Sequence, residues 1–337
     1  YDDGQPVHHL PVSEARNAMP EHERPSTSGH GDPGGCTLVV FGGAGDLTRR
    51  LLLPAILNLA AEGRLPDRFA LVGYGRTDLD DESYRERLDG AVKAHAREGL
   101  DPALWKRLRP RVRWVRGSFD DPEAFGRLRD TLGEVGREHG TGACALFYLA
   151  CPPRFFLEVA RQLGTAGLAR EEDGHWRRLI VEKPFGRDLD SARQLNRNLL
   201  EVFAEPQLFR IDHYLGKETV QNILAFRFAN GFFEPIWNRR YVDSVQITVA
   251  ESLGVEGRGN YFERAGTLRD MVPNHLFQVL TLIAMEPPSS LGADAVRDEK
   301  TKVLRSVPTW SPEQVASDAV RAQYGPGRLP GGEEPVS

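Results

Sequence analysis

Cysteine is scarce in this chain, with three residues among 337. Cys36, Cys144 and Cys151 do not have the spacing of a metal site, and the last two lie in or beside an apolar run. We therefore expect reduced cysteines, with no metal and no disulfide framework, which favours a cytoplasmic location.

The sequence also lacks a long apolar run and a strong excess of charge of one sign. No stretch approaches the roughly 18 apolar residues that a membrane-spanning helix needs. The first 35 residues contain no apolar segment typical of a signal peptide. The formal net charge is −5 and 27% of the residues are charged, which is ordinary for a soluble protein. These features predict neither a nucleic-acid partner nor a membrane partner.

Residues 1–35 have few large apolar side chains and many prolines, glycines, serines, histidines and acids. A segment of this composition cannot bury enough surface to offset the entropy lost on ordering. The sequence therefore predicts a disordered tail over 1–35.

Short apolar runs alternate with segments of helical spacing between residue 37 and about residue 210. This alternation predicts an α/β fold, a Rossmann-like, doubly wound parallel sheet with right-handed crossovers, in a domain spanning 36–210. The expected strands are 37–42, 68–75, 111–116, 143–150 and 177–182, and the expected helices are 46–61, 81–98 and those beginning at residues 122, 154 and 190.

The alternation stops after about residue 210, which predicts a second, α+β domain over 211–337. Residues 242–251 alternate apolar and polar side chains at period two, as in an antiparallel strand with one covered face. From Pro308 onward no periodicity is visible. Helices are expected over 214–230, over 262–285 with a break or kink at Pro273, and over 293–306.

A glycine-rich turn lies between the first expected strand and the first expected helix. Gly42, Gly43, Ala44, Gly45 and Asp46 occupy it. Glycines let the backbone approach a pyrophosphate closely, and the helix N-terminus offers free N–H groups and a positive dipole end. The spacing is shorter than the full G-x-G-x-x-G motif, so the strand–turn–helix context carries the prediction of a nucleotide. Asp46 as a plain helix cap is compatible with it.

The second expected strand ends without the acid that binds the ribose 2′-hydroxyl in NAD enzymes. Arg76 and Thr77 follow the strand instead. Because a guanidinium suits a 2′-phosphate, Arg76 favours NADP as the cofactor, with NAD possible. The alternative is a solvated arginine on a loop.

Two blocks, Glu182 to Gly186 and Arg210 to Glu218, place charged, proton-handling and turn-forming residues side by side. The second puts a carboxylate, an imidazole, a phenol and an ammonium between residues 212 and 217. Such a group can bind a phosphate and orient a base. Taken alone, Asp212 and His213 could equally form a turn.

On these residues the chain resembles the glucose-6-phosphate dehydrogenase family over about 41–305. The block at 210 is the most specific part of the resemblance. The matching stretches are Phe41 to Thr48, Tyr148 to Pro153, Glu182 to Gly186, Arg210 to Glu218, Glu251, Gly257 to Gly259, Tyr261-Phe262, Arg269-Asp270 and Asn274-His275.

The resemblance implies that His275 takes the proton from the C1 hydroxyl of glucose 6-phosphate and that Asp212 pairs with it. A neutral imidazole is a good base near pH 7, and a carboxylate fixes its tautomer. The implied substrate-binding residues are Lys183, His213, Tyr214, Lys217, Glu251 and Asp270. The implied cofactor-binding residues are Gly42, Gly43, Ala44, Gly45, Asp46, Leu47, Arg76 and Lys183.

The implied reaction is oxidation of D-glucose 6-phosphate at C1 to 6-phospho-D-glucono-1,5-lactone, with hydride transfer to NADP, the first step of the oxidative pentose phosphate pathway. The resemblance also implies a homodimer or tetramer for full-length family members. The alternative is a catalytically weak or silent relative that binds nucleotide or sugar phosphate. A third reading is a related oxidoreductase that acts on another sugar.

The chain departs from the family at two positions of the cofactor turn and in its length. Ala44 stands where many members have Ser or Thr, and Leu51 stands where many have a lysine. Family members usually continue well beyond residue 337, through more of an antiparallel sheet. We therefore expect a C-terminally incomplete second domain and weak activity.

Overall fold

The computed structural model describes residues 34–97, 99–172, 174–250, 259–323, 327–329 and 332–334. The expected tail lies outside these ranges, apart from Gly34 and Gly35. Glu251 and the expected motif positions 257 and 258 also lie outside them. The chain divides into two compact units, Tyr1–Ala150 with Gln162–Arg178, and Cys151–Arg161 with Leu179–Ser337.

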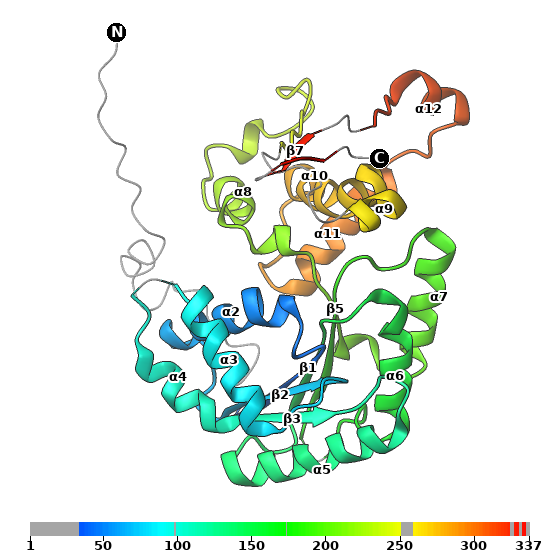
Figure 1. Cartoon of the computed structure of the whole chain (residues 1–337). Helices are drawn as coiled ribbons and strands as arrows, with labels where there is room; N and C mark the ends of the chain where they lie inside the picture. Colours follow the sequence, from blue (N-terminus) through cyan, green and yellow to red (C-terminus); the bar gives the residue numbers. More distant parts are fainter. Residues whose placement is uncertain are drawn as a thin grey trace. The chain divides into compact units, whose positions relative to one another are not determined.

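A six-stranded sheet has the strand order β3-β2-β1-β4-β5-β6, and the pairs β1–β2, β1–β4, β2–β3 and β5–β6 are parallel (Figure 1). This order confirms the predicted doubly wound α/β fold. The strands are β1 Cys36–Phe41, β2 Phe69–Gly75, β3 Val112–Arg116, β4 Ala145–Leu149, β5 Arg177–Val181 and β6 Leu208–Arg210. The short β6 falls where the sequence pattern predicted that the alternation stops.

Helices of the first unit begin at local capping signals. Asp80 accepts a hydrogen bond from the Ser83 backbone N–H, and Asp121 accepts from the N–H groups of Glu123 and Ala124. Helix α4 begins with a proline at its first position, which the sequence analysis did not recognise as a helix start. The helices are α2 Leu53–Ala61, preceded by a π-helix over Thr48–Leu52, then α3 Asp81–His95, α4 Pro102–Leu108 and α5 Pro122–His139.

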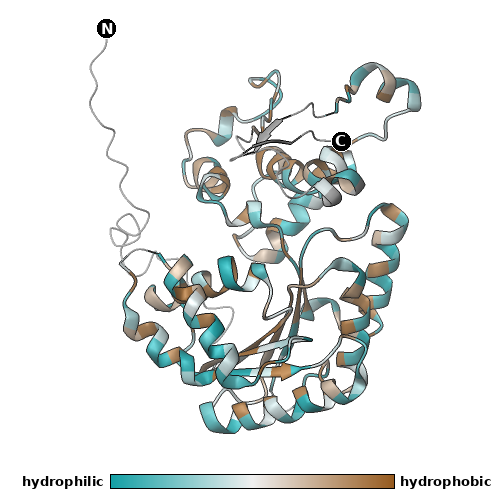
Figure 2. Ribbon diagram, in the orientation of Figure 1, coloured by the Kyte–Doolittle hydropathy of each residue, from teal (hydrophilic) through white to brown (hydrophobic). Residues whose placement is uncertain are grey.

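The core of the first unit covers both faces of its strands. On one face, Phe41 and Tyr74 pack against Phe125 of α5, with ring centroids 5.8 and 5.1 Å away. On the other face, Tyr84 of α3 contacts Trp114 at 4.6 Å. Figure 2 shows the strands as predominantly hydrophobic, as expected for a parallel sheet that is buried on both faces.

The remaining elements are largely helical. They are α6 Phe156–Thr165, α7 Leu189–Leu200, the 3-10 helix η5 His213–Gly216, α8 Glu218–Phe228, α9 Gly259–Met271, the π-helix η8 Val272–Leu276, α10 Phe277–Ala284, α11 Ala293–Ser306 and α12 Pro312–Asp318. The predicted break at Pro273 is confirmed, because Pro273 lies in the π-helix that separates α9 from α10. The predicted helix over 293–306 is also confirmed.

One expectation for the second unit is wrong within the described residues. Residues 242–250 form no strand, although Ile247 and Val249 are less exposed than their neighbours. A period-two pattern shows which face is apolar, but a strand also requires a hydrogen-bonded neighbour. The described antiparallel pairing is the short pair of β7 Gly327–Leu329 and β8 Gly332–Glu334.

The region after Pro308 is not uniformly irregular, because helix α12 occupies Pro312–Asp318. Ser311 caps it by accepting from the Gln314 N–H, and Pro312 occupies the first helical position. Proline at that position favours a helix start, so Ser311 and Pro312 form a local start signal that the missing periodicity did not reveal.

Among the described residues, no helix has both the length and the apolar character needed to cross a membrane.

Candidate active site

The adjacent strands β5 and β6 end side by side at one edge of the sheet. Val181 of β5 is in register with Arg210 of β6, and the Ile211 N–H donates to the Val181 carbonyl at 3.1 Å. Lys183 and Asp212 each follow one of these ends. The carboxyl ends of parallel strands are where ligands bind in open α/β sheets, so this pairing brings the two charged blocks together.

Asp212 caps the helix η5 and orients the imidazole of His275. Its Oδ1 atom accepts hydrogen bonds from the Tyr214 backbone N–H at 3.0 Å and from His275 Nδ1 at 2.6 Å. Within the described part of the chain, Oδ2 is buried without a hydrogen-bond partner. The carboxylate therefore holds the proton of His275 on Nδ1 and leaves Nε2 as the basic atom.

His275 lies in the π-helix η8 and is 1% exposed. The ring of Tyr214 stacks on its imidazole, with centroids 4.0 Å apart and an interplanar angle of 13°. The ring of His213 meets it edge-on at 4.6 Å. Single turns of π-helix are frequent at functional sites, and here such a turn carries His275 into the site.

Lys183 connects the base to a second carboxylate. Its Nζ atom lies 2.8 Å from His275 Nε2 and 3.1 Å from Asp270 Oδ1. The ammonium donates to both atoms, so His275 accepts at Nε2 while it donates at Nδ1. Asp212, His275, Lys183 and Asp270 thus form one continuous chain of hydrogen bonds.

The electrostatics favour the neutral form of His275. Burial lowers the pKa of its imidazole below the ordinary value, and the Lys183 ammonium lowers it further, whereas Asp212 opposes the shift. The pKa of His213 is also lowered, by burial and then by Lys183. A neutral imidazole can accept a proton.

Tyr214 and Lys217 extend the cluster on the side of η5. The Lys217 ammonium lies 3.7 Å from the centroid of the Tyr214 ring, and both His213 and Lys217 are exposed. Tyr214 is buried. The structure therefore brings together six of the predicted substrate and catalytic residues around His275: Lys183, Asp212, His213, Tyr214, Lys217 and Asp270.

A metal ion has little room in this cluster. Ligand atoms of Asp212, His213 and His275 lie within 4.8 Å of one another. An ion bound to His275 would have to displace either the Asp212 carboxylate from Nδ1 or the Lys183 ammonium from Nε2. The donor set therefore suits proton transfer better than metal binding.

The glycine-rich turn of the first unit has the backbone that close contact with a phosphate requires. Gly42 has a φ of 96°, which favours glycine. A Cβ on Gly43 would lie 2.7 Å from the Gly73 Cα, and one on Gly45 would lie 2.9 Å from the Gly42 carbonyl oxygen. The turn therefore has no room for larger residues at these two positions.

The residues around the turn differ in their contacts and exposure. Asp46 is ion-paired with Arg49 and Arg50, at 3.3 and 3.4 Å. Leu47 is half-buried immediately before the π-helix. The Ala44 carbonyl accepts from Arg87 of α3 at 3.2 Å, a contact that sequence reasoning missed because Arg87 lies in a polar helix without a motif.

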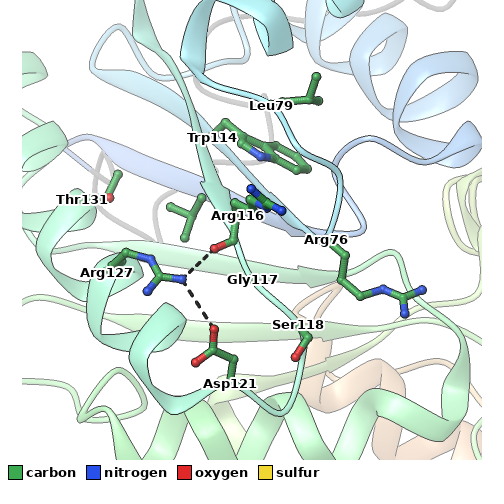
Figure 3. Close-up of a pocket in the computed structure, with 10 residues that line it drawn as sticks. Arg76, Leu79, Trp114, Arg116, Gly117, Ser118, Asp121, Arg127 and Thr131 are labelled. Carbon is green, nitrogen blue, oxygen red and sulfur yellow. Dashed lines mark hydrogen bonds and ion pairs between the residues drawn. The ribbon is translucent and has the colours of Figure 1, made fainter.

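Arg76 follows β2 and is exposed. It lines an open pocket of about 730 Å³ together with Trp114, Arg116, Ser118 and Arg127. Figure 3 shows Arg127 bonded to the Arg116 carbonyl and to Asp121, at 2.9 and 3.5 Å, while the Arg76 guanidinium extends away from this pair. Arg76 is thus available to an anion. Arg116, whose place in the pocket lining sequence reasoning missed, is ion-paired with Asp78.

Two family models match the chain. A family model described as "Glucose-6-phosphate dehydrogenase, NAD binding domain" matches residues 39–222, and one described as "Glucose-6-phosphate dehydrogenase, C-terminal domain" matches residues 224–336. The chain belongs to the glucose-6-phosphate dehydrogenase family.

Curated relatives in the glucose-6-phosphate dehydrogenase family include "Glucose-6-phosphate 1-dehydrogenase 2" of Mycobacterium tuberculosis, 48% identical over 303 residues, which are 90% of this chain and 58% of the relative. The enzyme of Chlamydia pneumoniae is 45% identical over 299 residues, 88% of this chain and 58% of the relative. The chain thus spans somewhat more than half the length of these relatives.

Solved structures of the same family are also similar. One, described as glucose-6-phosphate dehydrogenase in complex with its substrate glucose-6-phosphate, has a TM-score of 0.73 and 40% identity, covering 80% of this chain and 55% of that one. The Mycobacterium avium glucose-6-phosphate 1-dehydrogenase has a TM-score of 0.71 and 36% identity, covering 83% and 59%.

Proposed function

We propose that this chain oxidises glucose 6-phosphate at C1 to 6-phospho-D-glucono-1,5-lactone and transfers the hydride to NADP. The observation that carries the proposal is the hydrogen-bonded series Asp212–His275–Lys183, which holds a neutral imidazole with its basic nitrogen toward an ammonium. Membership of the family and the solved relative with glucose 6-phosphate support this choice of substrate.

His275 acts as the general base. Its Nε2 accepts the proton of the C1 hydroxyl while the C1–H bond breaks and C1=O forms. Asp212 keeps the other imidazole proton on Nδ1 and stabilises the imidazolium that results. NADP, when bound, accepts the hydride. No further acid or metal is needed for the balance of the reaction.

Lys183 donates to the Nε2 atom of His275 that would receive the proton of the substrate hydroxyl. The C1 hydroxyl replaces its hydrogen bond to Nε2, and the ammonium remains held by Asp270 at 3.1 Å. The Lys183 ammonium lowers the pKa of His275 before substrate binds. It also stabilises the negative charge that develops on the C1 oxygen as that oxygen loses its proton. Asp270, and Glu251 outside the described residues, accept hydrogen bonds from sugar hydroxyls in this proposal.

His213, Tyr214 and Lys217 bind the phosphate. Exposed imidazole and ammonium groups suit an incoming anion. The buried Tyr214 ring stacks on His275, so the residue that joins the phosphate site to the base is held rigidly. We also propose a location in the cytoplasm and a homodimer or tetramer for the whole protein.

The glycine turn and the end of β2 would hold the cofactor. Its pyrophosphate would be bound by Gly42, Gly43, Ala44, Gly45, Asp46 and Leu47, its 2′-phosphate by Arg76, and its nicotinamide would be contacted by Lys183. The lack of room for a Cβ on Gly43 and Gly45 fits a close backbone approach. In this proposal residues 36–210 form the dinucleotide-binding domain and residues 211–337 the substrate domain.

The proposal is tested by following NADPH absorbance with glucose 6-phosphate and the His275→Asn variant. Removal of a general base typically costs about 10²–10⁴-fold in rate. His95→Asn, at an exposed histidine of α3, is the matched control and should keep the wild-type rate. Full turnover by His275→Asn would contradict the assignment of the base.

A silent relative is the second candidate, and one observation favours it. Leu51, which stands where many family members have a lysine, is 62% exposed beside the cofactor turn. Binding of glucose 6-phosphate and NADP by calorimetry without any NADPH production would support this alternative. Leu51→Lys would then be expected to restore turnover.

A further inference from the structure

Lys300 is a half-buried lysine of α11 to which the proposed reaction assigns no role. Its ammonium donates to the side-chain carbonyl of Gln278 on α10, and these two helices pack together. Gln278 follows His275 by three positions, so it lies about one helical turn from the base. Lys300 is thereby held next to the helix segment that carries the base.

The Asp212 carboxylate also acts electrostatically on Lys300. Burial lowers the pKa of the Lys300 ammonium, and the Asp212 carboxylate opposes that shift more strongly than any other group acts on it. On the carboxylate itself, Oδ1 carries both hydrogen bonds, and the buried Oδ2 has no hydrogen-bond partner among the described residues. A buried carboxylate with one unbonded oxygen requires a nearby positive charge.

We propose that Lys300 is a positioning residue that balances the charge of Asp212 and so sets how readily His275 accepts a proton. The inference rests on the proposed function, because it assigns Lys300 a part in preparing the same base. A cation near Asp212 reduces the field that the carboxylate exerts on the imidazole.

Other charged groups act on the same pair and must stay in place for the effect to be attributed to Lys300. They come from the segment after β5, from η5, from α9 and from α11. They are Glu182 and Lys183, His213 and Lys217, Asp270, and Arg297.

The test compares Lys300→Met, Lys300→Arg and Lys302→Met in the purified protein. Lys302 lies on the same helix but is exposed and paired with Glu299 at 2.6 Å, which makes it the matched control. The first readout is the His275 imidazole signal in NMR titrations, identified by its absence from His275→Asn. The second is the acid limb of the pH profile of kcat.

Lys300→Met should move both midpoints to higher pH, because the unbalanced carboxylate then favours the imidazolium. At a pH well below the midpoint of the acid limb, kcat falls about tenfold for each pH unit by which that midpoint rises. Lys300→Arg should restore the wild-type midpoints, and Lys302→Met should leave them unchanged.

An unmoved His275 midpoint in a folded Lys300→Met protein would overturn the inference, even if the rate fell equally at every pH. Thermal unfolding of all three variants identifies any that fail to fold, and Lys300→Gln then replaces Lys300→Met. If the wild-type protein forms no NADPH, the proposed function fails, whereas the NMR midpoint still decides the role of Lys300.

Discussion

The Nδ1 atom of His275 lies 2.6 Å from Oδ1 of Asp212, although 63 positions separate the two residues in the chain. The carboxylate is fixed by the start of a 3-10 helix after β6, and the imidazole by a π-helix that contains Pro273. The proposed base and the carboxylate that orients it are thus positioned by two different short helices.

Asp212→Asn should lower kcat about 10²–10⁴-fold with a smaller change in KM for glucose 6-phosphate. The amide can donate to Nδ1, which would place the imidazole proton on Nε2 and remove the basic lone pair. Steady-state kinetics check this. Asp190→Asn, an exposed residue of α7, is the control, and a kcat for Asp212→Asn equal to that of the control would be inconsistent with an orienting role.

Lys183→Met should raise the pKa of His275. The ammonium 2.8 Å from Nε2 lowers that pKa in the folded protein, so its removal makes protonation easier. NMR titration of the His275 imidazole measures the change without depending on activity. Lys93→Met, an exposed lysine of α3, should leave the titration unchanged. A lower or unmoved His275 midpoint in Lys183→Met would speak against the electrostatic role.

Arg76→Gln should raise KM for NADP about 10- to 100-fold and change KM for NAD little. Hydrogen bonds to a charged group contribute about 1.5–3 kcal/mol, and NAD lacks the 2′-phosphate that would form them. Initial rates with each cofactor provide the measurement. Arg64→Gln, an exposed arginine beyond α2, serves as the control. Equal losses with both cofactors would mean that Arg76 does not read the 2′-phosphate.

Gly43→Ala should destabilise the first unit by about 1–3 kcal/mol and abolish tight cofactor binding, because its Cβ would lie 2.7 Å from the backbone of Gly73. Gly90→Ala on α3 is the opposite case. A Cβ at Gly90 meets nothing within 4 Å, so that variant should gain about 0.5–1 kcal/mol. Urea unfolding measures both changes in stability. An unchanged free energy of unfolding in Gly43→Ala would show that the glycine turn and β2 can move apart at little cost.

Local signals in the sequence determined much of the first unit. Three kinds of signal act within a few residues and so predict a strand, turn or helix directly. They are the apolar run of β1, the glycines after it, and the capping acids of α3 and α5. Pro273 marked the end of α9 for the same reason, because its ring disrupts the helix that contains it. The helices α4 and α12 were not predicted, although each begins with a proline at a position that favours a helix start.

The tertiary structure decided the contacts that no local pattern in the sequence names. The alternating residues 242–250 form no strand in the described part of the chain, because a strand needs a partner that its own sequence does not name. No motif in the sequence marks Lys300, yet the packing of α11 on α10 half-buries it and its ammonium donates to Gln278. The resemblance to the family predicted that Asp212 pairs with His275, whereas the ammonium at Nε2 and the contact of Lys300 with Gln278 depend on how separate elements pack.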